Sequence, residues 1–170
     1  MKQLQSAVFF VLLSIFFGCE DKSESPEMSV ERYVEQLKAG KYDNMELPDF
    51  SSEDIPELLS YRNETQLITG FPINYISSSL TQECALGMYV LWTVESIRAR
   101  SSGSEFLVGT FPSQNPVVEN RADFGYIEQN QQVLKEVADS YFEWWESNKT
   151  QDFSEFHQID PLGTTAYRWH

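Results

Sequence analysis

The fold is decided by the stretch Cys84-Ala-Leu-Gly-Met-Tyr-Val-Leu-Trp-Thr-Val-Glu-Ser-Ile-Arg-Ala-Arg100. Over residues 84–94, apolar side chains occupy nearly every face of a helix, which is the pattern of a helix enclosed by other elements. Ser79 and Gln82 have the spacing of a capping box near its start, and the arginines at its end suit the negative end of the helix dipole. The apolar part is shorter than the roughly 20 residues that span a bilayer, so we predict a buried central helix.

Two shorter helices are predicted upstream. In the first, apolar residues recur with helical spacing from Val30 to Leu37, and Ser29 and Gly40 mark its two ends. The second lies in residues 51–62, where a Ser51-x-x-Asp54 box competes with an Asp54-x-x-Glu57 box. We favour the second box, because it places the proline at position 56 in the first turn, where a missing N–H costs little. Residues 63–80 are predicted to be a loop packed by its own side chains.

Downstream of the central helix, residues 104–111 are predicted to be extended or a short helix. Residues 126–149 form a second long amphipathic helix of roughly 30 Å or more, which we expect to pack against the central one. The tail, residues 152–170, is too apolar for a free end and is predicted to dock on the helices. Its large apolar residues are Phe153, Phe156, Ile159, Leu162, Tyr167 and Trp169.

These elements predict an all-α fold in residues 29–170, a compact irregular bundle of four to five helices, with stacked helix pairs as one arrangement. The alternative is α+β with a small two-stranded hairpin. A chain of 170 residues fits a single domain of this kind.

The first 18 residues have the pattern of a secretion signal, with one lysine and an apolar run that ends at Phe17. Gly18-Cys19 follows this run as in a bacterial lipobox, although Phe16 stands where leucine is usual. We therefore predict that Cys19 is diacylated and becomes the first mature residue, so that acyl chains hold the protein to a membrane. The alternative is a disulfide between Cys19 and Cys84. Residues 19–28 are polar and charged, and are predicted to be a flexible tether.

The formal charge of the chain is −14, and residues 1–18 carry one lysine and no acid, so the mature chain carries −15. Such a chain repels phosphate backbones. We therefore predict no nucleic-acid partner and no adhesion to anionic lipid through a basic patch.

Five short segments carry a family resemblance. They are Asp54-Ile-Pro-Glu-Leu-Leu-Ser-Tyr, Leu67-Ile-Thr-Gly-Phe-Pro, Gly87-Met-Tyr-Val-Leu-Trp-Thr-Val-Glu-Ser-Ile-Arg98, Phe111-Pro-Ser-Gln-Asn-Pro and Asp160-Pro-Leu-Gly. With them the chain resembles, over most of its mature length, a domain-of-unknown-function family of short Bacteroides lipoproteins. The acidic residues behind Cys19 also resemble the export signals of surface lipoproteins in such bacteria. The resemblance implies export and a compact helical domain, and it transfers no catalytic residue and no activity.

Several candidate sites are weak on their spacing alone. Glu155, His157, Asp160 and His170 are metal-ligand types, but their spacing matches no known ligand pattern, and we predict no metal or cofactor site. Cys84 has no neighbouring cation that would lower its pKa, so we predict a packed thiol and not a nucleophile.

Glu95 lies on the central helix in line with Met88, Leu91 and Trp92, where it could be partly buried. We expect a structural ion pair, either with Arg98 at i+3 or with Arg62, in preference to a catalytic carboxylate, and we predict no catalytic residue.

Trp144, Trp145 and Trp169 are the candidate binding surface, because exposed aromatic clusters can stack on sugars or anchor a protein partner. Core packing is the alternative for these rings. From these observations we expect a lipid-anchored envelope protein, in the outer membrane and facing the periplasm or the cell surface. We expect it to act as a non-enzymatic binding or scaffold module for an envelope protein or a glycan. The alternative is a hydrolase acting on cell-envelope or glycan material.

Overall fold

The computed structural model describes residues 28–77 and 82–170. The predicted signal (1–18), Cys19, the predicted tether up to residue 27 and Ser79 of the predicted capping box lie outside these ranges. The described elements, in chain order, are α1 (Val30–Lys38), η1 (Ser52–Asp54), α2 (Ile55–Ser60), β1 (Leu67–Thr69), β2 (Glu83–Ala85), α3 (Leu86–Ser102), β3 (Val118–Asn120), α4 (Gln131–Asn148), α5 (Phe153–Phe156) and β4 (Tyr167–Trp169).

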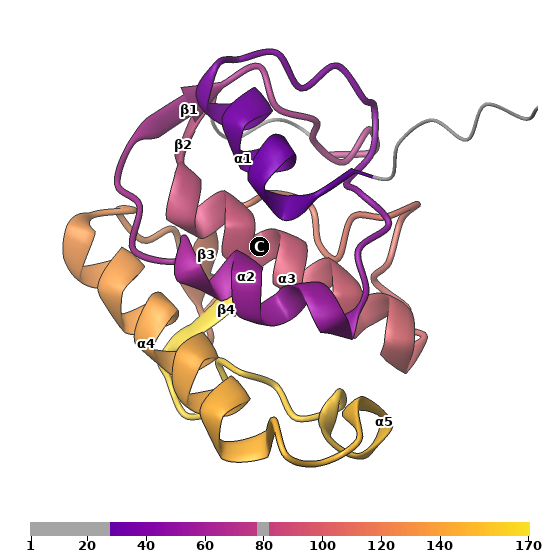
Figure 1. Cartoon of the computed structure of the whole chain (residues 1–170). Coiled ribbons are helices and arrows are strands. Elements are labelled where there is room, and N and C mark those ends of the chain that lie inside the picture. The colour runs from indigo at the N-terminus through magenta and orange to yellow at the C-terminus, as the bar shows by residue number, and fades with distance from the viewer. Residues whose placement is uncertain (1–27, 78–81) are drawn as a thin grey trace, which may run out of the picture.

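Helix α3 runs through the middle of the molecule, with α1 and α2 to one side of it and α4 to another (Figure 1). All but four of its 17 residues are buried, which confirms the predicted central helix. The contacts of α3 are polar as well as apolar: the Tyr33 hydroxyl of α1 and the Thr93 hydroxyl of α3 form a buried hydrogen bond of 2.9 Å. The neighbouring elements enclose α3. The polar residues of its last turns therefore contact residues from the C-terminal half of the chain.

The two upstream helices form where the sequence places them. Ser29 caps α1, and its hydroxyl accepts a hydrogen bond from the Arg32 N–H, as predicted. The favoured Asp54-x-x-Glu57 box is wrong. The capping box that the structure shows is the competing one, which joins Ser51 to Asp54 at the start of η1. Asp54 makes no side-chain cap to α2, although Pro56 does lie in the first turn of that helix. The reason is that the Asp54 carboxylate already accepts from the Ser51 N–H at 2.7 Å.

The all-α prediction is wrong, because the fold is α+β with two small antiparallel sheets. Strand β1 pairs with β2 and strand β3 pairs with β4, each through three residue pairs. The predicted alternative was α+β with a single hairpin, and neither observed sheet is a tight hairpin. Three-residue strands are shorter than the four to eight residues over which alternation can be recognised, so periodicity does not reveal them.

Helix α3 begins two residues later than its apolar run, because Cys84 belongs to β2. Its N-cap residue, Ala85, makes no side-chain hydrogen bond. The first N–H groups of the helix donate instead to the chain before β1, from Leu86 to the Gln66 carbonyl at 2.8 Å and from Gly87 to the Glu64 carbonyl at 2.9 Å. A Cβ at position 87 would stand 2.4 Å from the Arg62 carbonyl oxygen, so this approach requires glycine.

The C-terminal segment docks on the helices, as predicted. Phe156 and Leu162 are almost fully buried, and β4 pairs with β3 in the register Val118 to Trp169. Figure 1 shows β4 passing beside α4, toward the middle of the molecule. Helix α4 begins at residue 131, five residues after the predicted start, and the preceding residues 126–129 pack as an irregular segment. None of the helices in residues 28–77 and 82–170 combines the length and the apolarity needed to cross a bilayer.

Candidate functional site

A largely buried ion pair lies on α3. Glu95 and Arg98 are one turn apart, and the guanidinium binds the carboxylate through both of its oxygens, from Nη2 to Oε1 at 2.6 Å and from Nε to Oε2 at 2.9 Å. The third donor of Arg98, Nη1, bonds the His157 carbonyl oxygen at 2.9 Å. This confirms the predicted structural pair with Arg98, and Arg62 is not the partner.

Two aromatic side chains extend this pair into the core. The Tyr141 hydroxyl donates to Glu95 Oε2 at 2.6 Å, and the Trp169 indole N–H donates to the Tyr141 hydroxyl oxygen at 2.8 Å. Burial, together with the negative charge of Glu95, raises the pKa of Tyr141 well above its usual value. Burial alone would lower the pKa of Arg98, but the hydrogen bonds and charge of Glu95 raise it above the usual value. Tyr141 and Arg98 therefore keep their protons throughout the neutral pH range.

A cleft of about 640 Å³ opens beside this network, and we call it the arginine cleft. Its volume lies within the range of roughly 300–1,000 Å³ that is usual for small-molecule sites. Its walls come from α3, from residues 104–114, and from the β3–β4 sheet with the segment that leads into β4. The lining residues are Asn74, Ile76, Glu95, Arg98, Ser104, Glu105, Phe106, Val108, Pro112, Ser113, Gln114, Arg121, Asp160, Arg168, Trp169 and His170.

Two arginines of the cleft come from neighbouring positions on the β3–β4 sheet. Arg168 lies opposite Glu119 in the ladder, and the Arg121 N–H continues the ladder by bonding the Ala166 carbonyl at 2.8 Å. Residues 121 and 168 are therefore diagonal neighbours on the same face of the sheet. Such neighbours are about 7–8 Å apart, which is within reach of long side chains.

Each of these arginines is paired with an acid. Arg121 Nη2 bonds Asp160 Oδ2 at 2.7 Å, and Arg168 Nε lies 3.4 Å from Glu119 Oε1. Among the described residues, the Nη atoms of Arg168 and the Nη1 atom of Arg121 make no hydrogen bond. The cleft thus presents unused guanidinium donors, which suit planar acceptors such as carboxylates.

A residue with an unusual backbone conformation, Phe124, lies against the Arg168 side chain. Phe124 has φ +58°, the only positive φ of a residue other than glycine in the described ranges. This conformation is strained for a bulky side chain, and the ring is 60 % exposed, so burial does not compensate the strain. The ring instead lies against the Arg168 guanidinium, whose Cζ atom is 4.8 Å from the ring centroid. A cation over an aromatic face is attracted to it, so Phe124 helps to fix the direction of Arg168.

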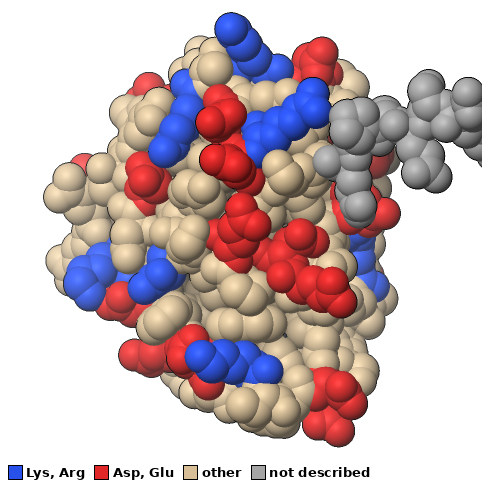
Figure 2. Space-filling view, in the orientation of Figure 1, with Lys and Arg blue, Asp and Glu red and all other residues tan. Residues whose placement is uncertain are grey.

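The charge of the cleft differs from that of the chain as a whole. Its lining contains three arginines and three acids, Glu95, Glu105 and Asp160, so the formal charges of these six side chains sum to zero. On the face that carries α1 and α2, by contrast, acidic side chains gather across the middle (Figure 2). On a chain of formal charge −14, the cleft is thus a place where an acceptor-rich ligand meets less repulsion.

The fold separates the three tryptophans of the predicted binding surface. Trp144 and Trp169 are only 6 % and 8 % exposed, and Trp145 is half-buried. Trp144 packs against Phe156, with ring centroids 5.3 Å apart. Of the three, only Trp169 lines the arginine cleft, so it is the tryptophan that a ligand there would touch.

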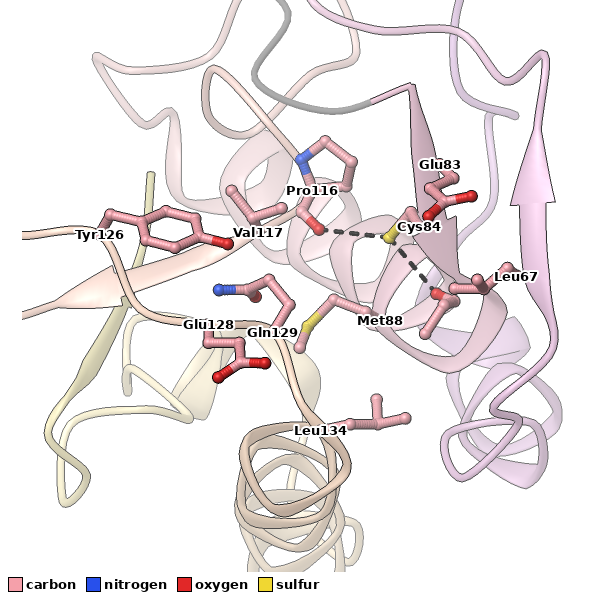
Figure 3. A pocket seen from close by; sticks show the side chains of 11 residues that line it. Leu67, Glu83, Cys84, Met88, Pro116, Val117, Tyr126, Glu128, Gln129 and Leu134 are labelled. Atoms are coloured by element: carbon pink, nitrogen blue, oxygen red, sulfur yellow. Dashed lines mark hydrogen bonds between the residues drawn. The ribbon is translucent and has the colours of Figure 1, made fainter.

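A second, smaller pocket of about 280 Å³ lies between β2 and the start of α4, with Cys84 in its wall (Figure 3). The buried thiol donates to the carbonyls of Ala85 and Pro116, each at 3.4 Å. Burial raises the pKa of Cys84 from 9.0 to about 12, so the thiol stays protonated at neutral pH and is a poor nucleophile.

The predicted histidine and acid candidates do not converge on one another. His157 Nδ1 lies 3.1 Å from the Phe153 carbonyl oxygen, Asp160 pairs with Arg121, and His170 Nδ1 lies 3.2 Å from the Asn115 amide nitrogen. Within residues 28–77 and 82–170, no three His, Cys, Asp or Glu side chains are grouped as a metal site requires.

Sequence reasoning did not find Arg121, Arg168 or Phe124. The two arginines are far apart in the sequence, and only the pairing of two three-residue strands brings them together. No local pattern marks Phe124, because a positive φ at a phenylalanine cannot be recognised from composition or spacing.

Comparison with known proteins identifies the family of the chain. No curated protein and no solved structure matches the chain. A family model described as Domain of unknown function (DUF4943) matches residues 24–170, which is most of the chain and the whole of the described domain. The chain therefore belongs to the DUF4943 family.

Proposed function

We propose that this domain is a non-enzymatic binding module that holds a small polar ligand in the arginine cleft. The observation that carries the proposal is the set of unused donors on Arg121 and Arg168, held in place by Asp160, Glu119 and Phe124 inside a cleft of ligand size. Donors fixed before the ligand arrives lose little entropy when it binds.

Two of the three acids that line the cleft are engaged in hydrogen bonds inside the protein, and the third, Glu105, is exposed to solvent. Both oxygens of Glu95 are occupied by Arg98, and one of them also accepts from Tyr141. Asp160 accepts from Arg121 through Oδ2 and from the Leu162 N–H through Oδ1. A general acid or base must exchange a proton with its substrate, and these carboxylates are already committed to donors inside the protein. A hydrolase acting on envelope or glycan material therefore has less support.

The setting we propose is the bacterial cell envelope. Acyl chains on Cys19 hold the protein to the outer membrane, and residues 19–28 form a tether that lets the domain reach a glycan or an envelope protein in the periplasm or at the cell surface. The lipobox-like Gly18-Cys19 and the acidic residues behind it support this setting. So does the resemblance to short Bacteroides lipoproteins.

Ligand-observed saturation-transfer NMR on the full-length protein in detergent tests the binding proposal. The probes are glucose, galacturonic acid, N-acetylglucosamine and dialanine. We expect at least one probe to receive saturation from the wild type, to lose it with Arg168→Gln and to keep it with Lys135→Gln. Lys135 is the matched control, because it is a cation paired with an acid on the exposed face of α4. A panel without signal, or a signal that Arg168→Gln leaves intact, would overturn the proposal.

A further inference from the structure

We propose that the arginine cleft is specific for a sugar that carries a single carboxylate, and that Arg121 and Arg168 bind this carboxylate. The inference rests on the proposed function and adds the chemical class of the ligand. It follows from three features of the cleft: the position of its unused donors, the extent to which their charge is already compensated, and the polarity of its walls.

The unused donors form one group. Arg121 and Arg168 lie on the same face of the β3–β4 sheet as diagonal neighbours, and both residues line the same cleft. Their bases are anchored, because Arg121 Nε donates to the Tyr167 carbonyl at 3.1 Å and Arg168 Nε lies beside Glu119. A carboxylate between them can therefore accept from both guanidinium groups without breaking either ion pair.

The strained Phe124 is a second observation that points to Arg168. A glycine or asparagine would adopt its φ of +58° at less cost, yet the chain keeps a large exposed ring there. In this strained conformation the Phe124 ring contacts the Arg168 guanidinium. Residues held in strained conformations cluster at functional sites, where surrounding structure maintains them.

The charge balance favours one carboxylate over a phosphate. The Arg168 side chain is 37 % exposed, whereas that of its partner Glu119 is 11 % exposed, so a ligand meets the cation before the acid. The positive charge is nonetheless partly compensated by Glu119 and Asp160. On a chain of formal charge −14, a dianion would gain less from such compensated cations than it loses to repulsion.

The walls of the cleft combine polar groups with apolar surface, which suits a sugar, because a sugar ring carries hydroxyl groups and also has an apolar face. Eleven of its 16 lining residues are polar or charged, and they offer both donors and acceptors. Hydroxyl groups both donate and accept, so a hydroxyl-rich ring suits such walls. The other five residues are apolar, among them Trp169 and the exposed Phe106, and apolar atoms make up about half of the wall surface, so the walls can cover the apolar face of a sugar ring.

Isothermal titration calorimetry on the full-length protein in detergent, at 150 mM salt and pH 7, tests the inference with matched ligands. We expect glucuronate to bind at least about tenfold more tightly than glucose, glucuronic acid methyl ester and glucose 6-phosphate. The methyl ester is the sharpest comparison, because it keeps the ring and the hydroxyls and removes only the negative charge. Dialanine tests whether a peptide carboxylate is preferred.

Variants locate the effect. Arg168→Lys keeps the positive charge and removes the planar fork, and we expect it to weaken glucuronate binding at least about tenfold. Phe124→Asn is expected to weaken binding while keeping the melting temperature equal or higher, because asparagine tolerates the positive φ. Lys135→Gln is expected to leave both unchanged. If Arg168→Lys does not fold, Phe124→Asn still decides the role of Arg168.

The outcomes separate the inference from the proposed function. Equal binding of glucose and glucuronate in the cleft, or tighter binding of the methyl ester or the phosphate, would overturn the carboxylate preference and leave a binding module. Binding of dialanine with no binding of glucuronate would replace the sugar by a peptide. Absence of binding by both glucuronate and galacturonate, with glucose or N-acetylglucosamine still bound, would refute the inference alone. Absence of binding by every probe would overturn both.

Discussion

The indole N–H of Trp169 donates to the hydroxyl oxygen of Tyr141 across 2.8 Å, and the same hydroxyl donates to Glu95 at 2.6 Å. This single oxygen joins β4, α4 and α3. Because it lies in the core, neither bond can be exchanged for water without opening the domain. The position of Trp169 in the arginine cleft therefore depends on the Tyr141 hydroxyl.

Tyr141→Phe should lower the free energy of unfolding by roughly 2 kcal/mol, because it leaves a buried indole N–H without its acceptor and a buried carboxylate with one donor fewer. Chemical denaturation measures the loss. Tyr167→Phe is the matched control, since it also removes a tyrosine hydroxyl that bonds a glutamate, here Glu136, but at the surface. Equal losses in the two variants would show that the buried network adds nothing.

Leu162→Ala should lower the free energy of unfolding by about 2–5 kcal/mol, because Leu162 is almost fully buried under the C-terminal segment. Ile159→Ala, three residues earlier and half-exposed, should cost much less. Removal of residues 161–170 should abolish soluble expression or lower the melting temperature sharply, since it also removes β4. A truncated chain that melts like the wild type would contradict the docked position of the tail.

The Cys84 thiol should resist alkylation at pH 8 in the folded protein and react readily in urea, because it is buried and protonated. Its raised pKa also predicts a pH dependence of stability. Below pH 9 both the folded and the unfolded chain keep the proton. Between pH 9 and about 12 only the unfolded chain loses it, so the free energy of unfolding falls as the pH rises.

Cys84→Ala lacks this ionisation and serves as the control. Between pH 8 and pH 10.5 the wild type should lose about 2 kcal/mol more stability than Cys84→Ala. The comparison cancels the tyrosines, which are common to both proteins. Parallel stability curves, or rapid alkylation of the folded protein, would place the thiol at an accessible position.

Cys19→Ala should prevent the incorporation of labelled fatty acid into the protein, because diacylation requires this sulfur. The unacylated protein should then leave the membrane fraction. Metabolic labelling followed by membrane fractionation checks this. Cys84→Ala, which removes the other cysteine of the chain, should label like the wild type. Labelling that survives Cys19→Ala would refute the anchor.

The sequence predicts the elements whose patterns are local and long enough to repeat. The stripe of α1 and its Ser29 cap, the buried run of α3 and most of α4 belong to this group. The strands do not, because three residues carry no measurable alternation, and β3 and β4 pair across almost 50 residues of chain. The all-α prediction failed for this reason.

The same distinction holds for the sites. The ion pair of Glu95 and Arg98 can be predicted, because an i, i+3 spacing on a helix places the two groups together. Arg121 and Arg168 meet only through the β3–β4 ladder, so no method that reads local spacing could have grouped them. The burial of Trp144 follows from α5, a four-residue helix whose position depends on the docked tail.

The junction between β2 and α3 sets an order of events during folding. A helix ordinarily begins at a local cap, but α3 obtains the partners of its first N–H groups from Glu64 and Gln66, about 20 residues earlier in the chain. The first N–H groups of the central helix therefore gain these bonds only once the segment before β1 is in place. Closing that loop costs entropy before the helix gains its hydrogen bonds, so the element with the strongest helical pattern is finished only after a long-range contact has formed.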